Sequence, residues 1–199
     1  MEENPDKAWL DKVRAIDEDA SRLKRGSCIL AQPENARIVV DAIGFHRGSG
    51  LLLHAWCAMP NHVHAVVTTD ERIKLNSWLE SIKKFSARRI NERSGRSGSL
   101  WERESFNHLV RTPGYFGKFC EYVEENPVAA GLCHTRDQWP HSSARPGAIK
   151  DALERFVSPY DTTFVAPRDR GELTHIIKEQ GTYFVTFRLL DSVILRGKR

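Results

Sequence analysis

The sequence predicts an α/β (α+β) fold in which helices pack against a β-sheet. Three observations support this prediction. Apolar residues recur at helical spacing through residues 5–25. Two β-prone segments, 51–59 and 62–69, are separated by a Pro-Asn turn and are expected to pair as a hairpin. The strongest strand pattern, residues 182–190, is rich in aromatic and β-branched side chains and stands near the end of the chain.

Prolines and glycines mark the boundaries of the predicted helices. Pro5 begins the first helix and Gly26 ends it, and Pro33 lies in the first turn of the second. The Asn126-Pro127 pair is expected to end a later helix, because proline disrupts the helical hydrogen-bond pattern. The predicted helices span residues 5–25, 33–45, 75–92, 113–125 and about 149–156.

Length and composition indicate a soluble protein of ordinary size. The 199 residues suit one domain with a substantial core. No apolar run reaches the ~18 residues that a membrane span needs, and the polar N-terminus does not resemble a signal peptide. The four cysteines form no CxxC pair, so we expect reduced thiols in a cytosolic protein.

Positive charge is concentrated in one stretch. Residues 72–96 contain eight basic and two acidic side chains, a net charge of +6, whereas the whole chain carries +4. A basic stripe on a helix is the usual signature of a protein that binds a polyanion. The alternative is an ordinary solvated helix face. The candidate polyanion-binding residues are Lys83, Lys84, Arg88 and Arg89.

Two histidines stand one residue apart in the segment "MPNHVHAVV". Side chains alternate along a strand, so His62 and His64 point to the same face. Two imidazoles side by side either bind a metal ion or lie in the core as ordinary sheet histidines. A zinc site that adds Cys57 is a further alternative.

Tyr122 and Asn126 stand at i and i+4 on one predicted helix and therefore share a face. If that face packs over the histidines, Asn126 supplies a carbonyl oxygen and Tyr122 places its phenol beside the metal. Two nitrogens plus oxygen ligands suit Mg²⁺ or Mn²⁺ better than a closed zinc site. A phenol beside such a metal suggests covalent catalysis on a phosphate. Taken singly, the two residues read as a helix tyrosine and a helix-end asparagine.

Several blocks of the sequence resemble the single-tyrosine HUH transposases, above all the REP-associated tyrosine transposases. The blocks are "MPNHVHAVV", "LWERESF", "SFNHLVRTPGYFGKFCEYVEENPVAAGL" and "WPHSSA", in the family's order within residues 8–144. The resemblance implies a ferredoxin-like antiparallel sheet and an enzyme that cuts and rejoins single-stranded DNA, often at the foot of a hairpin. It also implies that His62, His64 and Asn126 bind the metal and that Tyr122 is the nucleophile.

One block departs from the family's order. A segment similar to the family's first strand, within residues 170–195, stands at the end of this chain. The chain therefore looks circularly permuted, and we expect this strand in the centre of the sheet. The predicted organisation is a core of residues 1–144, a linker of residues 145–169 and a C-terminal segment of residues 170–199 that completes the sheet.

The predicted function is metal-dependent nicking and transfer of single-stranded DNA through a 5′-phosphotyrosine, a polarity that follows from the resemblance. Trp101 and Phe106 are candidates for stacking on bases. The expected location is the bacterial cytoplasm, at the nucleoid, and the chain is a monomer or a homodimer. The alternatives are a hairpin-binding module without catalysis, a metal hydrolase that uses water, and a non-catalytic α/β protein.

Overall fold

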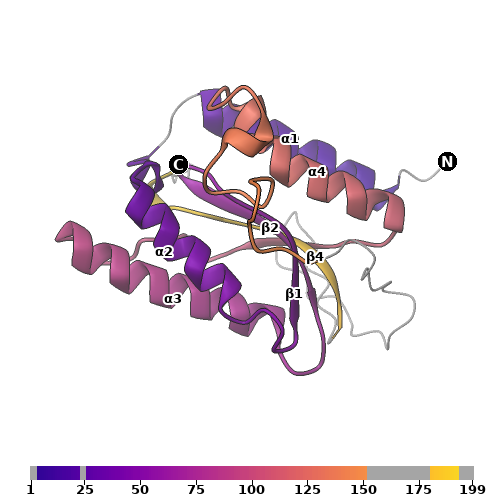
Figure 1. The fold of residues 1–199 in the computed structure, drawn as a ribbon, viewed down its shortest axis with the longest axis horizontal. Helices are drawn as coiled ribbons and strands as arrows, with labels where there is room; N and C mark the ends of the chain where they lie inside the picture. The colour runs from indigo at the N-terminus through magenta and orange to yellow at the C-terminus, as the bar shows by residue number, and fades with distance from the viewer. Residues whose placement is uncertain (1–3, 23–25, 152–179, 193–199) are drawn as a thin grey trace, which may run out of the picture.

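A computed structural model describes residues 4–22, 26–151 and 180–192 of the chain (Figure 1). Its four long helices and four strands form an α+β fold, as predicted. Within the described residues, no helix has both the length and the apolar composition that crossing a bilayer demands. In chain order the elements are α1 (Pro5–Arg22), α2 (Pro33–Gly44), β1 (Leu51–Ala58), β2 (His62–Thr69), α3 (Leu75–Ser94), β3 (Phe106–Leu109), α4 (Pro113–Ala129) and β4 (Gly181–Arg188).

The four strands form one antiparallel sheet in the order β1-β2-β4-β3. β1 and β2 pair as the predicted hairpin. β4 lies between β2 and β3, so the C-terminal strand is central, as the sequence predicts. It pairs along its whole length with β2, from His62 opposite Arg188 to Thr69 opposite Gly181. The sheet therefore depends on a strand that the chain supplies last.

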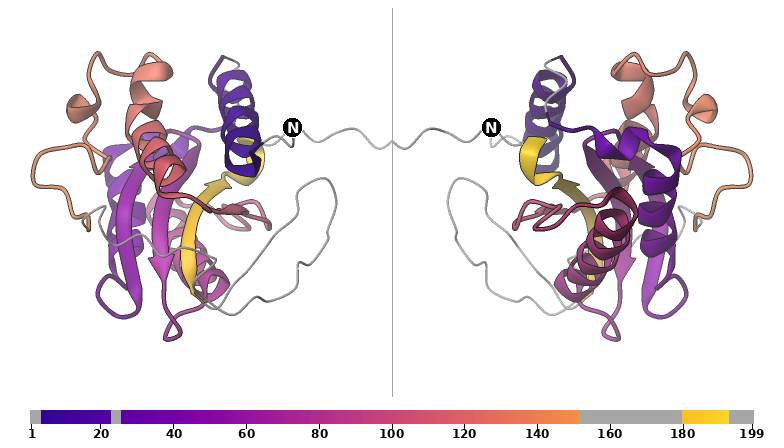
Figure 2. Two further views of the ribbon diagram at one scale, coloured as in Figure 1. Left: turned by 90° about the vertical axis from the view of Figure 1, so that its right-hand side faces the viewer. Right: turned by 90° about the vertical axis from the view of Figure 1, so that its left-hand side faces the viewer.

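The helices cover the two faces of the sheet in pairs (Figures 1 and 2). α2 and α3 pack on one face, and α1 and α4 pack on the other. Each face has its own apolar core because alternate strand residues point to opposite sides. The first core includes Trp56, Val63, Trp78, Ile82, Tyr183 and Phe187. The second, which surrounds the histidine pair, includes Leu10, Val13, Val66, Phe119, Val123 and Phe184.

The predicted end of α4 is wrong. The helix continues through Pro127 to Ala129 instead of stopping at the Asn126-Pro127 pair. Proline removes one N–H donor, but the N–H groups of residues 130–132 satisfy the carbonyls of residues 126–128, so the last turn remains closed. Asn126 is consequently inside the helix, where its side chain is buried, rather than at an exposed end.

The sequence suggested that Trp101 stacks on bases, but its side chain is not at the surface. Its side chain is buried, its indole N–H donates to Ser86 Oγ at 2.9 Å, and its ring meets Phe187 edge-on. The apolar ring closes the core under α3, and the paired N–H removes the cost of burying a polar atom. Phe106, the other stacking candidate, is half-buried at the start of β3.

The segment after α4 runs back along the edge of the sheet. Residues 141–143 follow β1, with a backbone hydrogen bond from Ala58 N–H to the carbonyl of His141 at 2.9 Å. Residues 149–151, the start of a predicted helix, are irregular. The rest of that helix, most of the predicted linker 145–169 and the strand-like segment "LTHII" lie outside the described residues.

Candidate metal and nucleophile site

The two histidines of β2 lie side by side on the face of the sheet that α1 and α4 cover. Their ring centroids are 4.6 Å apart, and both side chains are buried. His62 Nδ1 is 2.7 Å from Asn61 Oδ1, and His64 Nδ1 is 2.7 Å from Thr186 Oγ1. A carbonyl oxygen can only accept, so Asn61 assigns the Nδ1 proton of His62 and leaves its Nε2 lone pair free. The Thr186 hydroxyl can accept from Nδ1 of His64 and hold that ring in the same tautomer.

A third side chain, Asp17 of α1, completes this cluster. One carboxylate oxygen lies 2.9 Å from His64 Nε2, and the other lies 4.0 Å from His62 Nε2 and 2.5 Å from an Arg188 nitrogen. Burial alone would raise the pKa of Asp17, but His64, His62 and Arg188 outweigh it and hold the pKa far below the usual range. Asp17 is therefore a buried anion at neutral pH.

The sequence analysis missed Asp17, although the spacing of α1 contains a signal. Asp6, Leu10, Val13 and Asp17 follow one another at i, i+4, i+7 and i+11, and all four are buried. Acidic residues on the apolar stripe of an amphipathic helix need a partner from another element. Two carboxylates within the stripe thus mark two places where α1 makes polar contacts with other elements of the fold.

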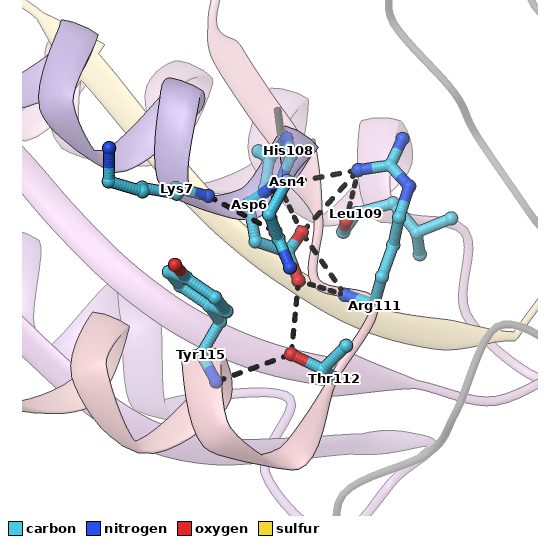
Figure 3. A network of polar contacts seen from close by, with 8 residues as sticks. All are labelled: Asn4, Asp6, Lys7, His108, Leu109, Arg111, Thr112 and Tyr115. Atoms are coloured by element: carbon cyan, nitrogen blue, oxygen red, sulfur yellow. Dashed lines mark hydrogen bonds and ion pairs between the residues drawn. The ribbon is translucent and has the colours of Figure 1, made fainter. Parts of the chain in front are cut away.

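Asp6 fixes the other end of α1 (Figure 3). Its carboxylate accepts hydrogen bonds from His108 Nε2 at 2.8 Å, from the Arg111 backbone N–H at 3.1 Å and from Thr112 Oγ1 at 3.4 Å. The Trp9 ring stacks on His108 with centroids 5.1 Å apart. This network ties α1 to the junction of β3 and α4, so it helps to hold Asp17 over the histidines.

Tyr122 and Asn126 of α4 both reach the histidine cluster. The Tyr122 hydroxyl donates a hydrogen bond to Asp17, and its ring centroid is 5.5 Å from that of His64. Burial and the Asp17 carboxylate raise the pKa of Tyr122 well above its ordinary value, so the phenol is protonated. Asn126 lies beside His62 and raises the pKa of that ring, although burial and His64 outweigh this effect. All of these groups come from one chain.

The residues present fit a divalent cation. Buried atoms without an aligned hydrogen-bond partner, among the described residues, include Nε2 of His62, Nε2 of His64 and Oδ1 of Asn126. Burial, followed by the neighbouring His64, lowers the pKa of His62 to about 3, so its ring is neutral and its lone pair is available. Single ligand atoms of Asp17, His62 and His64 all lie within 4.8 Å of one another. Mixed nitrogen and oxygen donors suit Mg²⁺ or Mn²⁺.

Cys57 lies opposite His64 in the β1–β2 register but stands apart from this cluster. Its thiol is directed to Met59 Sδ at 3.7 Å, and burial raises the pKa of the thiol well above its ordinary value. The other described tyrosines are also remote from a catalytic role. Tyr183 is fully buried in the opposite core, and Tyr115 lies in the first turn of α4.

The basic residues of α3 lie on the other side of the sheet. Lys84, Arg88 and Arg89 are exposed on α3, which packs with α2 on the face away from the histidines. Lys83 is half-buried, and its ammonium donates to the backbone carbonyls of residues 102–104 at 2.9–3.3 Å. The structure therefore does not bring these four residues to the histidine cluster, and their contact with DNA stays a prediction.

Residues 43–126 match the family model of IS200-like transposases. The matched segment begins in α2 and ends at Asn126, so it contains both histidines and Tyr122. The chain is a relative of the IS200-like transposases. Asp17 and Arg188 lie outside the matched residues, because the helix and the strand that carry them come from the two ends of the described chain.

One curated protein that is similar to this chain is also described as a transposase. A Haemophilus influenzae protein described as a REP-associated tyrosine transposase is 24% identical over 99 residues, 45% of this chain and 56% of the relative. The chain thus spans about half the length of that relative. No solved structure gives a significant match.

Proposed function

We propose that this protein cuts and rejoins single-stranded DNA through a covalent phosphotyrosine on Tyr122. One observation carries the proposal. The Tyr122 hydroxyl is hydrogen-bonded to a carboxylate that lies 2.9 Å from His64 Nε2. A candidate nucleophile and a candidate divalent-metal site therefore lie beside each other, an arrangement that supports metal-assisted phosphoryl transfer to a side chain. The match to the transposase family points the same way.

Each residue has a defined part in this reaction. His62, His64 and Asn126 would hold the metal, and Asp17 is a fourth candidate ligand. When bound there, Mg²⁺ or Mn²⁺ would supply charge that polarises the scissile phosphate and favours ionisation of the phenol. Tyr122 attacks phosphorus while the bond from phosphorus to the 3′ oxygen breaks. The products are a 5′-phosphotyrosine and a free 3′-hydroxyl, and attack by another 3′-hydroxyl reverses the step without ATP.

The proposed substrate is single-stranded DNA flanked by a hairpin. Lys84, Arg88 and Arg89 are exposed cations that can neutralise phosphates of DNA bound to α3. Because α3 lies on the far side of the sheet, such contacts would hold a part of the substrate away from the scissile phosphate. The chain functions as a monomer or as a homodimer.

The test is incubation of the protein with labelled single-stranded hairpin DNA and Mn²⁺, followed by a denaturing gel. Wild type should give a slow-migrating protein–DNA adduct that protease removes. Tyr122→Phe should bind the DNA normally and give no adduct. The matched control is Tyr115→Phe, which changes another tyrosine of α4 that does not contact the histidines and should leave the adduct unchanged.

Other outcomes would identify a different function. Cleaved DNA without an adduct, with little loss in Tyr122→Phe, would indicate a hydrolase that uses water. Hairpin binding without any cleavage by wild type in Mn²⁺ would indicate a binding module. If His62→Ala left the affinity for Mn²⁺ unchanged, the histidines would be ordinary sheet residues.

A further inference from the structure

Arg188, the last residue of β4, brings a guanidinium into the histidine and tyrosine cluster. It stands directly opposite His62 in the β2–β4 register. Its side chain is only 11% exposed, and one terminal nitrogen lies 2.5 Å from Asp17 Oδ1. The C-terminal strand therefore supplies a charged group to the site as well as the centre of the sheet.

The surroundings of the Asp17 carboxylate are those that a phosphodiester would need. The carboxylate accepts from the Tyr122 hydroxyl, contacts the Arg188 guanidinium and lies 2.9 Å from His64 Nε2. A phosphodiester, like a carboxylate, presents two oxygens that share one negative charge. A guanidinium binds both groups through the same planar fork of donors. The nucleophile, the imidazoles and the guanidinium thus converge on an anion.

Charge also favours a phosphate beside Arg188. Both imidazoles offer lone pairs rather than positive charge when they bind a metal. Among the described arginines, Arg188 contacts the Asp17 carboxylate directly. Arg14 instead lies over the Tyr122 ring, 5.8 Å from its centroid, and is about half exposed. Arg188 Nε is buried and has no hydrogen-bond partner among the described residues. A second oxygen of a bound anion could accept from this donor.

We propose that Arg188 binds the scissile phosphate and that the Asp17 carboxylate occupies the place of this phosphate until DNA enters. This inference rests on the proposed function. Arg188 binds a non-bridging oxygen, orients phosphorus toward the Tyr122 hydroxyl and balances the negative charge that develops during attack. Asp17 must release Arg188 when DNA binds, so the two anions compete for one guanidinium.

A binding experiment tests the proposal without metal or chemistry. The affinity of Tyr122→Phe for a fluorescent oligothymidylate of about 20 nucleotides is measured in EDTA. Adding Arg188→Gln should weaken binding about 10- to 100-fold, the range expected for one charge-assisted contact. Arg188→Lys should retain part of the affinity, since it keeps the charge. Asp17→Asn should strengthen binding several-fold, because the competing anion is removed.

Two further variants guard against a purely structural effect. Arg188→Gln leaves the buried Asp17 carboxylate without its cation and can impair folding. The double variant Asp17→Asn with Arg188→Gln removes both charges, and it should bind DNA about 10- to 100-fold more weakly than Asp17→Asn alone. Lys12→Gln, the matched control at an exposed position of α1, should change the affinity by less than about twofold. Equal DNA affinity in Asp17→Asn and the double variant would overturn the proposal.

Adduct formation with Mn²⁺ separates this inference from the proposed function. If wild type and Asp17→Asn both form the adduct and the folded double variant forms it at the same rate as Asp17→Asn, the role of Arg188 is refuted and the proposed function stands. If wild type forms no adduct, the proposed function fails, and the assignment of Arg188 to a scissile phosphate fails with it. The EDTA measurement then reports only an anion site.

Discussion

Asp6 and Asp17 lie about three turns apart on the buried face of α1, and each carboxylate binds a different part of the fold. Asp6 holds the helix to the β3–α4 junction, whereas Asp17 reaches the imidazoles of β2 and the guanidinium of β4. α1 is therefore attached at one end by a structural network and carries a candidate site residue at the other.

The first prediction concerns the Asp6 network. Asp6→Asn should lower the free energy of unfolding by about 1–3 kcal/mol, because it replaces an acceptor of several hydrogen bonds with a group that has fewer acceptor sites. Urea denaturation measures the change. Asp11→Asn is the control, since Asp11 is exposed and its ion pairs with described residues are long, at 3.7 and 3.9 Å. Equal stability of the two variants would contradict the anchoring role of Asp6.

The second prediction concerns the central strand. Phe184 of β4 is fully buried between the His64 ring, 5.6 Å away, and the Phe119 ring, 5.0 Å away. Phe184→Ala should cost about 3–5 kcal/mol of stability because it leaves a cavity under the candidate site. Leu190→Ala, at a 43% exposed position, should cost less than about 0.5 kcal/mol. A small loss for Phe184→Ala would mean that β4 does not complete this core.

The third prediction is that the free energy of unfolding decreases at acid pH. The pKa of His62 is lowered by burial and by His64 from 6.5 to about 3, so the unfolded chain takes up a proton that the native chain does not. Stability should therefore be fully present above about pH 6.5 and decrease as the pH falls toward 3. The measurement is urea denaturation in EDTA across this range.

His62→Gln should make this acid dependence less steep. His134→Gln, at an exposed position, is the control and should leave the dependence as it is in wild type. An identical slope in His62→Gln and wild type would show that the His62 ring accepts a proton equally well in the native and unfolded chains.

The fourth prediction tests the basic face of α3. Replacement of Lys84, Arg88 and Arg89 by glutamine should weaken binding of single-stranded DNA. The slope of log affinity against log salt concentration should become shallower by about 0.7 for each phosphate that the variant no longer neutralises. Fluorescence anisotropy over a salt series measures both. The control removes three exposed cations on separate elements, namely Arg37, Arg103 and Lys118. A slope equal to that of the control variant would show that α3 is an ordinary solvated face.

Local sequence patterns predicted much of the fold and part of the site. The spacing of apolar residues located α1 to α3, proline signals located α4, and the alternation along β2 put His62 and His64 on one face. The i, i+4 spacing put Tyr122 and Asn126 on one face of α4. These features depend on residues within one or two turns of each other, so a single sequence contains the information. The role of β4 at the centre of the sheet followed from resemblance to a family whose order of segments differs.

Only the tertiary structure decided which distant groups meet. Asp17, far along the chain from the histidines, looks like any other acidic residue of α1 until the helix packs over β2. The same packing assigns α3 to the opposite face and Trp101 to the core. The physical reason is that helical and strand periodicities fix which way a side chain points within its own element. The element it meets depends on how two faces of one sheet are covered by segments many residues apart.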